Sequence, residues 1–161
     1  MFLEKLIRRG LAVGSALVTT GVLIVAATPQ PAAASTVTLQ ATVDCFNVNY
    51  YGNTSDWYPS SLQVYTSPPS TYTPVPSGSL FAIPATHAFQ FAQALPSGAT
   101  TVGIAAVCSA GHQYGDFGWA SGTTNIPAGT TTVTASWGCS TGPVYPGPWV
   151  TTCSLQSVSF S

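Results

Sequence analysis

One internal repeat limits the folds open to this chain more than any other feature of its sequence. Residues 95–111 contain LPSGATTV followed by CSAG, and residues 126–142 contain IPAGTTTV followed by CSTG at the same spacing. In each copy, proline and glycine predict a tight turn that ends one strand, and the Thr-Thr-Val run predicts the next strand. Two copies are too few for a solenoid. We therefore expect two equivalent strand-turn-strand corners within one β-sandwich.

The segments around the repeat also have β patterns. Residues 37–45 alternate apolar and polar side chains with a period of two, and residues 62–66 do so again, which is typical of half-buried strands. Residues 87–95 fit a helical face as well as a strand, and the adjoining repeat favours the strand. Residues 68–78 are rich in proline and are predicted to form a loop, because proline cannot donate a ladder hydrogen bond. The pattern predicts an all-β fold.

The first residues have the order of a secretory signal peptide. Lys5, Arg8 and Arg9 form a cationic start, residues 11–27 are small or apolar without charge, and Ala32–Ala34 provide small side chains before Ser35. This order predicts a signal peptide over residues 1–34, since the apolar run is shorter than the roughly 20 residues of a membrane span. The Arg8-Arg9 pair leaves both general secretion and twin-arginine export open. We expect residues 35–161 to form a single domain, secreted or at the cell surface and without a membrane span.

Charge is nearly absent from the predicted mature chain. The three basic residues and the only glutamate lie within residues 1–34, so the mature chain keeps Asp44, Asp56 and Asp116 as its charged side chains. Nucleic-acid binding is excluded, because its affinity comes from cationic contacts to phosphate, and anionic membranes are disfavoured for the same reason. A chain with so little charge is compatible with surface attachment or self-association.

The four cysteines, Cys45, Cys108, Cys139 and Cys153, are even in number, and in an exported chain they predict disulfides. No Cys-x-x-Cys pair exists and the spacing to the histidines is irregular, so we expect no metal site, and nothing indicates a cofactor. The residues alone leave all three connectivities open.

The strand-like run His87–Phe91, the Leu95–Gly98 turn and the Thr-rich segment that ends at Gly111 together resemble the E-turn-F corner of bacterial immunoglobulin-like domains. Residues 126–142 resemble it more weakly. The resemblance implies an immunoglobulin-like antiparallel β-sandwich, in a family of mostly adhesive, spacing or accessory modules. It also implies that Cys45, at the end of strand B, pairs with Cys108 on strand F, and that Cys139 pairs with Cys153 around a local hairpin. The cysteines and the ring-rich loops depart from the family pattern, so no binding site or partner carries over.

One catalytic motif matches the sequence. Residues 138–142 fit G-x-S-x-G, the nucleophile elbow of α/β-hydrolases, with Ser140 as the nucleophile. That elbow requires a helix directly after the serine, and the prolines at positions 143, 146 and 148 forbid one. No Asp, Glu or His follows Ser140 to complete a triad. The repeat explains the match instead.

Acid-base catalysis has little support either. Glycoside hydrolysis needs two carboxyl groups across a cleft, whereas Asp44 is predicted to face outward from a strand and Asp56 and Asp116 to lie in turns. We interpret His112 and Asp116 as solvated loop residues rather than a catalytic dyad or half of a metal site. The sequence therefore predicts that the protein is not an enzyme.

Aromatic side chains concentrate in three segments, residues 50–58, 114–119 and 145–149. Trp and Tyr present flat apolar faces with polar edges, which suit the C–H faces and hydroxyls of neutral sugars. For each ring, packing at the ends of a thin sandwich is the alternative role. Trp137, which takes the place of Ala106 in the repeat, is assigned to the core or to a strand face. The candidate ligand-binding residues are Tyr51, Trp57, Tyr58, Tyr114, Trp119, Tyr145 and Trp149.

Taken together, these features predict a secreted, non-catalytic binding module, with neutral carbohydrate or a cell-wall polymer as the expected ligand. The first alternative is a structural envelope or matrix protein whose neutral strands associate edge to edge. A weaker alternative is a small exported enzyme inhibitor with a stiff, disulfide-held loop.

Overall fold

Strands joined by turns make up the part of the chain that the computed structural model describes, namely residues 36–45, 58–110, 113–114, 116–117 and 120–161. Within these residues the helical structure is one short 3-10 turn at Ser77–Ser79. All of them belong to one unit spanning Ala33–Ser161. The predicted signal peptide lies outside the described residues and stays a prediction.

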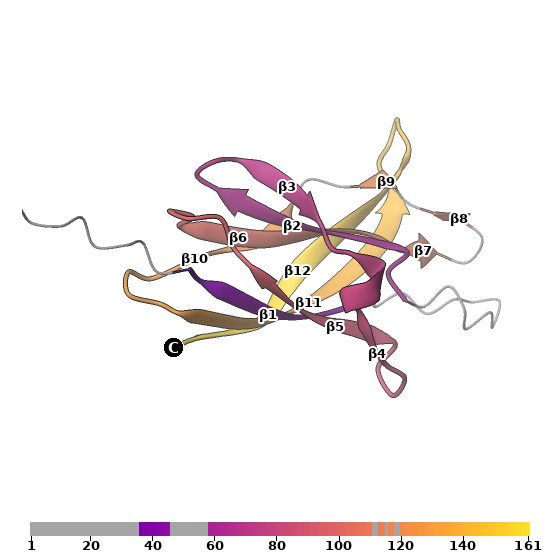
Figure 1. Ribbon diagram of the computed structural model, residues 1–161. Coiled ribbons are helices and arrows are strands. Elements are labelled where there is room, and N and C mark those ends of the chain that lie inside the picture. Colours follow the sequence, from indigo (N-terminus) through magenta and orange to yellow (C-terminus); the bar gives the residue numbers. More distant parts are fainter. Residues whose placement is uncertain (1–35, 46–57, 111–112, 115, 118–119) are drawn as a thin grey trace, which may run out of the picture. The chain divides into compact units, whose positions relative to one another are not determined.

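Two main sheets face each other (Figure 1). Sheet A has the order β4-β5-β1-β11-β12-β9, sheet B has the order β10-β6-β2-β3, and β7 and β8 form a separate ribbon. The predicted all-β sandwich is confirmed. The strands are β1 (Thr38–Cys45), β2 (Ser61–Ser67), β3 (Thr71–Pro74), β4 (Phe81–Ile83), β5 (Ala88–Ala94), β6 (Thr101–Val107), β7 (Ser109–Ala110), β8 (Gln113–Tyr114), β9 (Asp116–Phe117), β10 (Ser121–Asn125), β11 (Thr132–Pro143) and β12 (Trp149–Phe160).

Sheet A is mixed rather than purely antiparallel. β1 pairs with β5 in the antiparallel sense but with β11 in the parallel sense, and β12 pairs with β9 in parallel. A parallel pair requires a long connection between its strands, and in the sequence all the strands of sheet B lie between β1 and β11. The resemblance implied antiparallel pairing throughout, and the parallel pairs of sheet A correct that part of the expectation.

The core lies between the two sheets and follows the period of two. On β1 the buried side chains are Leu39, Ala41, Val43 and Cys45, while the residues between them are half-buried or exposed. β6 and β11 contribute their own alternating sets to the same cluster, the latter including Trp137. Trp137 is fully buried, and its indole N–H donates to the carbonyl of Gly122 at 2.9 Å, so this large ring has its polar atom satisfied. The core assignment of Trp137 is confirmed.

The repeat forms two corners, as predicted, and they cross between the sheets in opposite directions. The turn at residues 96–99 carries the chain from β5 in sheet A to β6 in sheet B, and the turn at residues 127–130 carries it from β10 in sheet B to β11 in sheet A. Gly98 and Gly129 have φ values of +81° and +86°. A hydrogen bond from the fourth residue to the first closes each turn, at 3.2 and 3.3 Å, as in a type II turn.

The two corners also share their hydrogen-bond pattern beyond the turn. Thr100 donates its backbone N–H and its hydroxyl to the carbonyl of Ser67, at 2.8 and 3.3 Å. The equivalent residue Thr131 donates the same two groups to the carbonyl of Ser161, at 2.7 and 3.0 Å. Ser67 ends β2, which neighbours β6, and Ser161 follows β12, which neighbours β11. Each repeat threonine therefore ties its strand to the end of the next one.

The loop predicted for residues 68–78 is wrong in its middle, where Thr71–Pro74 form the edge strand β3 of sheet B. Val75 donates its N–H to Leu62 in β2 at 3.0 Å. Because main-chain groups alternate in direction along a strand, Thr71 and Thr73 also face β2, whereas Tyr72 and Pro74 face the open edge. Proline is tolerated at position 74 because it lacks an N–H, and at the open edge of a sheet no neighbouring strand needs that hydrogen bond.

Candidate functional site

The four cysteines lie at one level of the sandwich. Cys45 is the register partner of Cys139 in the parallel β1–β11 pair, and Cys139 is the register partner of Cys153 in the β11–β12 hairpin. Cys108 directly follows β6 in sheet B and is joined to Cys45 in sheet A, with Cα atoms 5.7 Å apart. The second disulfide joins Cys139 to Cys153, with Cα atoms 3.9 Å apart. These are the two pairs that the immunoglobulin-like resemblance implied.

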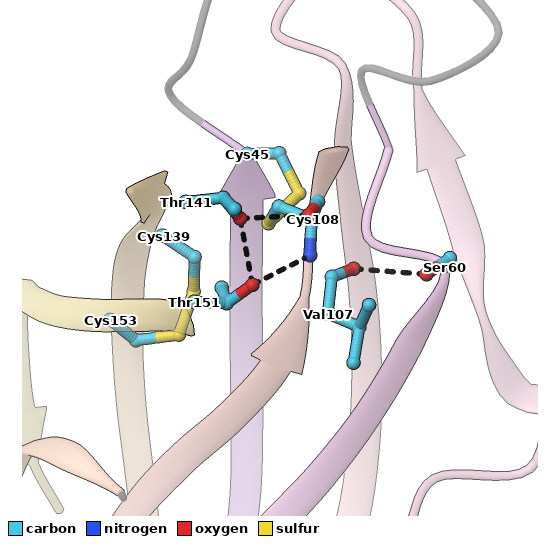
Figure 2. Close-up of a disulfide and its surroundings, with 8 residues drawn as sticks. All are labelled: Cys45, Ser60, Val107, Cys108, Cys139, Thr141, Thr151 and Cys153. Atoms are coloured by element: carbon cyan, nitrogen blue, oxygen red, sulfur yellow. Dashed lines mark hydrogen bonds between the residues drawn. A yellow bond between two sulfur atoms is a disulfide. The ribbon is translucent and has the colours of Figure 1, made fainter. Parts of the chain in front are cut away.

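A pair of buried threonines connects the two disulfides (Figure 2). Thr141 and Thr151 face each other across β11 and β12, with their hydroxyl oxygens 2.7 Å apart. The Thr141 hydroxyl donates to the carbonyl of Cys108 at 2.7 Å, and the N–H of Cys108 donates to the Thr151 oxygen at 3.1 Å. Since the proton of Thr141 is used on Cys108, the Thr151 hydroxyl donates to Thr141. The three residues form a closed ring of hydrogen bonds in which each bond polarises the next.

This ring is needed because β6 ends at Val107. The main-chain N–H and C=O of the fully buried Cys108 bond to side chains of sheet A and not to the main chain of a neighbouring strand. Buried main-chain polar groups without partners are costly. The two threonine hydroxyls on sheet A take the place of the missing strand.

We call the end of the sandwich that carries the cysteines the disulfide end. β1 ends there at Cys45, β2 begins there at Ser61, and β6 ends there at Val107, the register partner of Ser61. The β11–β12 hairpin continues past the Cys139–Cys153 pair to its turn at residues 144–148. The ring-rich segments 50–58, 114–119 and 145–149 are all attached to strands at or beyond this end. Three stretches that are distant in sequence are therefore joined to strands at the same end of the sandwich.

Among the predicted ring residues whose side chains the structure describes, Tyr145 has the most open position. Its side chain is 97% exposed and its neighbour Val144 is 52% exposed. Val144 N–H donates to the carbonyl of Pro148 at 3.1 Å, which closes the hairpin turn. A Cβ on Gly147 would lie 2.9 Å from the Val144 carbonyl oxygen, so glycine is required for this close approach. Trp149 is half-buried opposite Pro143 at the base of the turn.

Tyr58 has a structural role instead. It is half-buried, and its ring packs on Phe89 with centroids 4.9 Å apart and against the edge of His87 at 5.7 Å. These contacts favour the packing alternative for this ring. Tyr114 lies in the short strand β8 rather than in a loop, opposite Ser109. Tyr51, Trp57 and Trp119 lie outside the described residues.

The residues considered for catalysis occupy other positions. Ser140 lies within β11 opposite Thr152, so the strand-to-helix turn of a nucleophile elbow is not formed. Asp116, predicted in a turn, lies in strand β9 beside Val150; the turn prediction is wrong because this short stretch pairs with β12. Asp56 and His112 lie outside the described residues.

The burial of the Asp44 carboxyl was not predicted from the sequence. Asp44 faces outward from β1, as predicted, but its Oδ1 atom is buried without a hydrogen-bond partner, close to Gly138 and Gln156. Burial raises the pKa of the Asp44 carboxyl above its ordinary value. The alternation of β1 correctly placed this residue but contained no sign that its carboxyl would be covered.

Among the described residues, no group of three or more His, Cys, Asp or Glu side chains is arranged to hold a metal ion. In the same part of the chain, no helix has the length and apolar character needed to cross a bilayer.

The fold and its cross-links define a small all-β sandwich protein with two disulfides, which is compatible with an oxidising, extracellular environment. Comparison of the chain with protein-family models, curated proteins and solved structures found no match.

Proposed function

We propose that the mature chain is a secreted, non-catalytic binding module for neutral carbohydrate, and that its ligand binds at the disulfide end. The observation that carries the proposal is the common origin of the three ring-rich segments at this end, with Tyr145 almost fully exposed on the one segment whose side chains are described throughout. Rings that are held by a rigid base lose little conformational freedom on binding. The two disulfides and the threonine ring provide that base.

The electrostatics support an uncharged ligand. No lysine or arginine occurs after Arg9, and the hairpin segment 139–153 contains no ionisable side chain other than Tyr145 and the disulfide-bonded cysteines. An anionic ligand would find no cation to pair with. Neutral sugars need only ring faces and hydrogen-bonding groups, and Tyr145, Trp149 and nearby serine and threonine side chains offer both.

The proposal includes an immunoglobulin-like arrangement of the strands. The orders β4-β5-β1 and β10-β6-β2-β3 match D-E-B and G-F-C-C′, and the Cys45–Cys108 disulfide would then be the B–F bridge. Two features depart from that pattern. β11 lies beside β1 where strand A would pair, and the buried tryptophan is on β11 rather than on strand C. These departures come from the C-terminal hairpin, which carries the proposed site.

Retention on insoluble cellulose, chitin and peptidoglycan tests the ligand class. We expect the intact protein to be retained on at least one polymer, and Tyr145→Ala and Trp149→Ala to be retained less, because each loses a stacking face. Phe81→Ala is the matched control, since Phe81 is also a largely exposed ring, at 70%, but lies on the edge strand β4. No retention on any polymer, or equal losses with Phe81→Ala, would contradict the proposal.

A second candidate is a self-associating envelope or matrix protein. It is favoured by β11 and β12 of sheet A, whose exposed side chains are serine, threonine and glutamine, apart from Pro143 and Phe160 at the strand ends, and carry no charge. Edge-to-edge association is less favoured, because β4 is only three residues long and Pro74 faces the open edge of sheet B. Sedimentation of concentrated protein distinguishes the two candidates, since a strict monomer would contradict the second.

A further inference from the structure

We propose that Thr73 and Ser77 are acceptor sites for O-glycosylation. Residues 67–79 read SPPSTYTPVPSGS, a composition of serine, threonine and proline that is typical of O-glycosylated segments. The binding site proposed above does not use this segment, so the inference is independent of it. The structure shows which hydroxyl groups of this segment are exposed and which are not engaged in hydrogen bonds.

The segment lies where an enzyme can reach it. A transferase must surround its acceptor residue, and a central strand, paired on both sides, does not allow this. β3 is the edge strand of sheet B, with one side open. Thr73 in β3 and Ser77 after it are both exposed. Thr73 is in an extended strand, and Ser77 begins the short 3-10 turn directly after the extended Pro76, which has φ −61° and ψ 136°.

Most hydroxyls of the segment are already engaged in hydrogen bonds. Ser70 lies within 3.4 Å of both Ser67 and the Tyr65 hydroxyl. Thr71 bonds to Thr66 at 3.0 Å, and Ser79 donates to the Pro76 carbonyl at 2.7 Å. By contrast, the hydroxyls of Thr73 and Ser77 make no hydrogen bond within the described residues.

Proline supplies the remaining condition. Pro74 follows Thr73 and Pro76 precedes Ser77, and each fixes its own φ near −65° and pushes the residue before it toward extended conformations. The backbone of residues 73–76 is therefore restricted before any enzyme binds, which lowers the ordering cost of recognition.

The reaction would use a sugar activated by phosphate, as a nucleoside diphosphate or a lipid phosphate. The hydroxyl oxygen of Thr73 or Ser77 attacks the anomeric carbon, and the bond from that carbon to the phosphate oxygen breaks. The phosphate leaves with the electron pair, and the hydroxyl proton passes to a basic group of the transferase. No change of oxidation state occurs.

The expected consequence is hydration of an exposed edge. The mature chain has few charges to keep molecules apart in solution, and the main-chain N–H and C=O of Tyr72 are open to pairing with another strand. A glycan on Thr73 or Ser77 would cover this edge without adding charge.

Mass spectrometry of the protein secreted by its native host tests the proposal. Trypsin cannot cut the mature chain, which has no lysine or arginine, whereas chymotrypsin cutting after Tyr72 and Leu80 releases residues 73–80. We expect this peptide to carry one or two hexose-sized increments, on Thr73 and Ser77 and not on Ser79. Thr73→Ala combined with Ser77→Ala should remove them.

An exposed hydroxyl in a strand that is paired on both sides serves as the control. Thr134 in β11, which lies between β1 and β12, is also exposed, so sugar at this position as often as at Thr73 would show that exposure alone decides, and would overturn the proposal. An unmodified 73–80 peptide from the native protein would overturn it as well. The peptide map of the unmutated protein tests the proposal even if the double variant is not secreted.

Discussion

The hydroxyl groups of Thr141 and Thr151 lie 2.7 Å apart in the interior of the sandwich and together satisfy both main-chain polar groups of Cys108. The pair connects the hairpin that carries Tyr145 to the strand that carries the inter-sheet disulfide. The geometry of the disulfide end therefore depends on two side chains that are too short and too buried to contact a ligand.

Replacing either threonine by valine should destabilise the protein. Thr141→Val leaves the Cys108 carbonyl without a donor and Thr151→Val leaves its N–H without an acceptor, and each unpaired buried group costs about 1–3 kcal/mol. Urea denaturation measures the loss. Thr152→Val, at an exposed site on the same strand, is the control and should change stability little. A double variant whose loss equals the sum of the two single losses would contradict the shared ring.

Replacing either of the two repeat glycines by alanine should lower the stability of the protein by a similar amount. Gly98 and Gly129 both have positive φ and have nothing within 4 Å of an added Cβ, so the cost comes from the backbone alone, about 1–2 kcal/mol each. Gly78 has equal space without a positive φ, and Gly78→Ala is the matched control with little expected loss. Thermal unfolding of the three variants tests this, and an unequal effect of the two repeat substitutions would argue against equivalent corners.

The two disulfides should differ in their contribution to stability. Cys45 and Cys108 are 63 residues apart and Cys139 and Cys153 are 14 apart. The chain-entropy estimate gives about 4 kcal/mol for the longer loop and about 3 kcal/mol for the shorter one. Paired alanine substitutions, compared by urea denaturation without reductant, should show a larger loss for Cys45 with Cys108. The opposite order would show that packing around the hairpin outweighs loop closure.

Asp44 should make stability depend on pH. Its pKa is raised by burial in the folded protein, so the folded state holds the proton more tightly than the unfolded state. Stability is then highest below the ordinary aspartate pKa and falls as the pH rises toward the raised value. Asp44→Asn should remove this part of the pH dependence and increase stability at neutral pH. The test is the free energy of unfolding of both proteins, measured from about pH 3 to about pH 8, which covers the pH range in which carboxyl groups titrate. An unchanged difference between them at every pH would contradict it.

The sequence alone was sufficient for the strands and corners whose residues decide their structure locally. The alternation of residues 37–45, the proline and glycine of each repeat and the Thr-Thr-Val runs act on their own backbone, and the structure follows them. The resemblance to immunoglobulin-like domains also implied the correct cysteine pairs. The repeat also predicted that Trp137, in place of Ala106, would lie in the core or on a strand face, and it lies in the core.

Tertiary structure decided the features that no local pattern indicated. Residues 71–74 form a strand because they pair with the neighbouring strand β2, and the prolines on both sides hid that pairing. The parallel register of Cys45 and Cys139, the hydroxyl ring around Cys108 and the covered carboxylate of Asp44 each join segments far apart in the chain. No local pattern encodes such contacts, because they arise only when the two sheets stack and bury the groups between them.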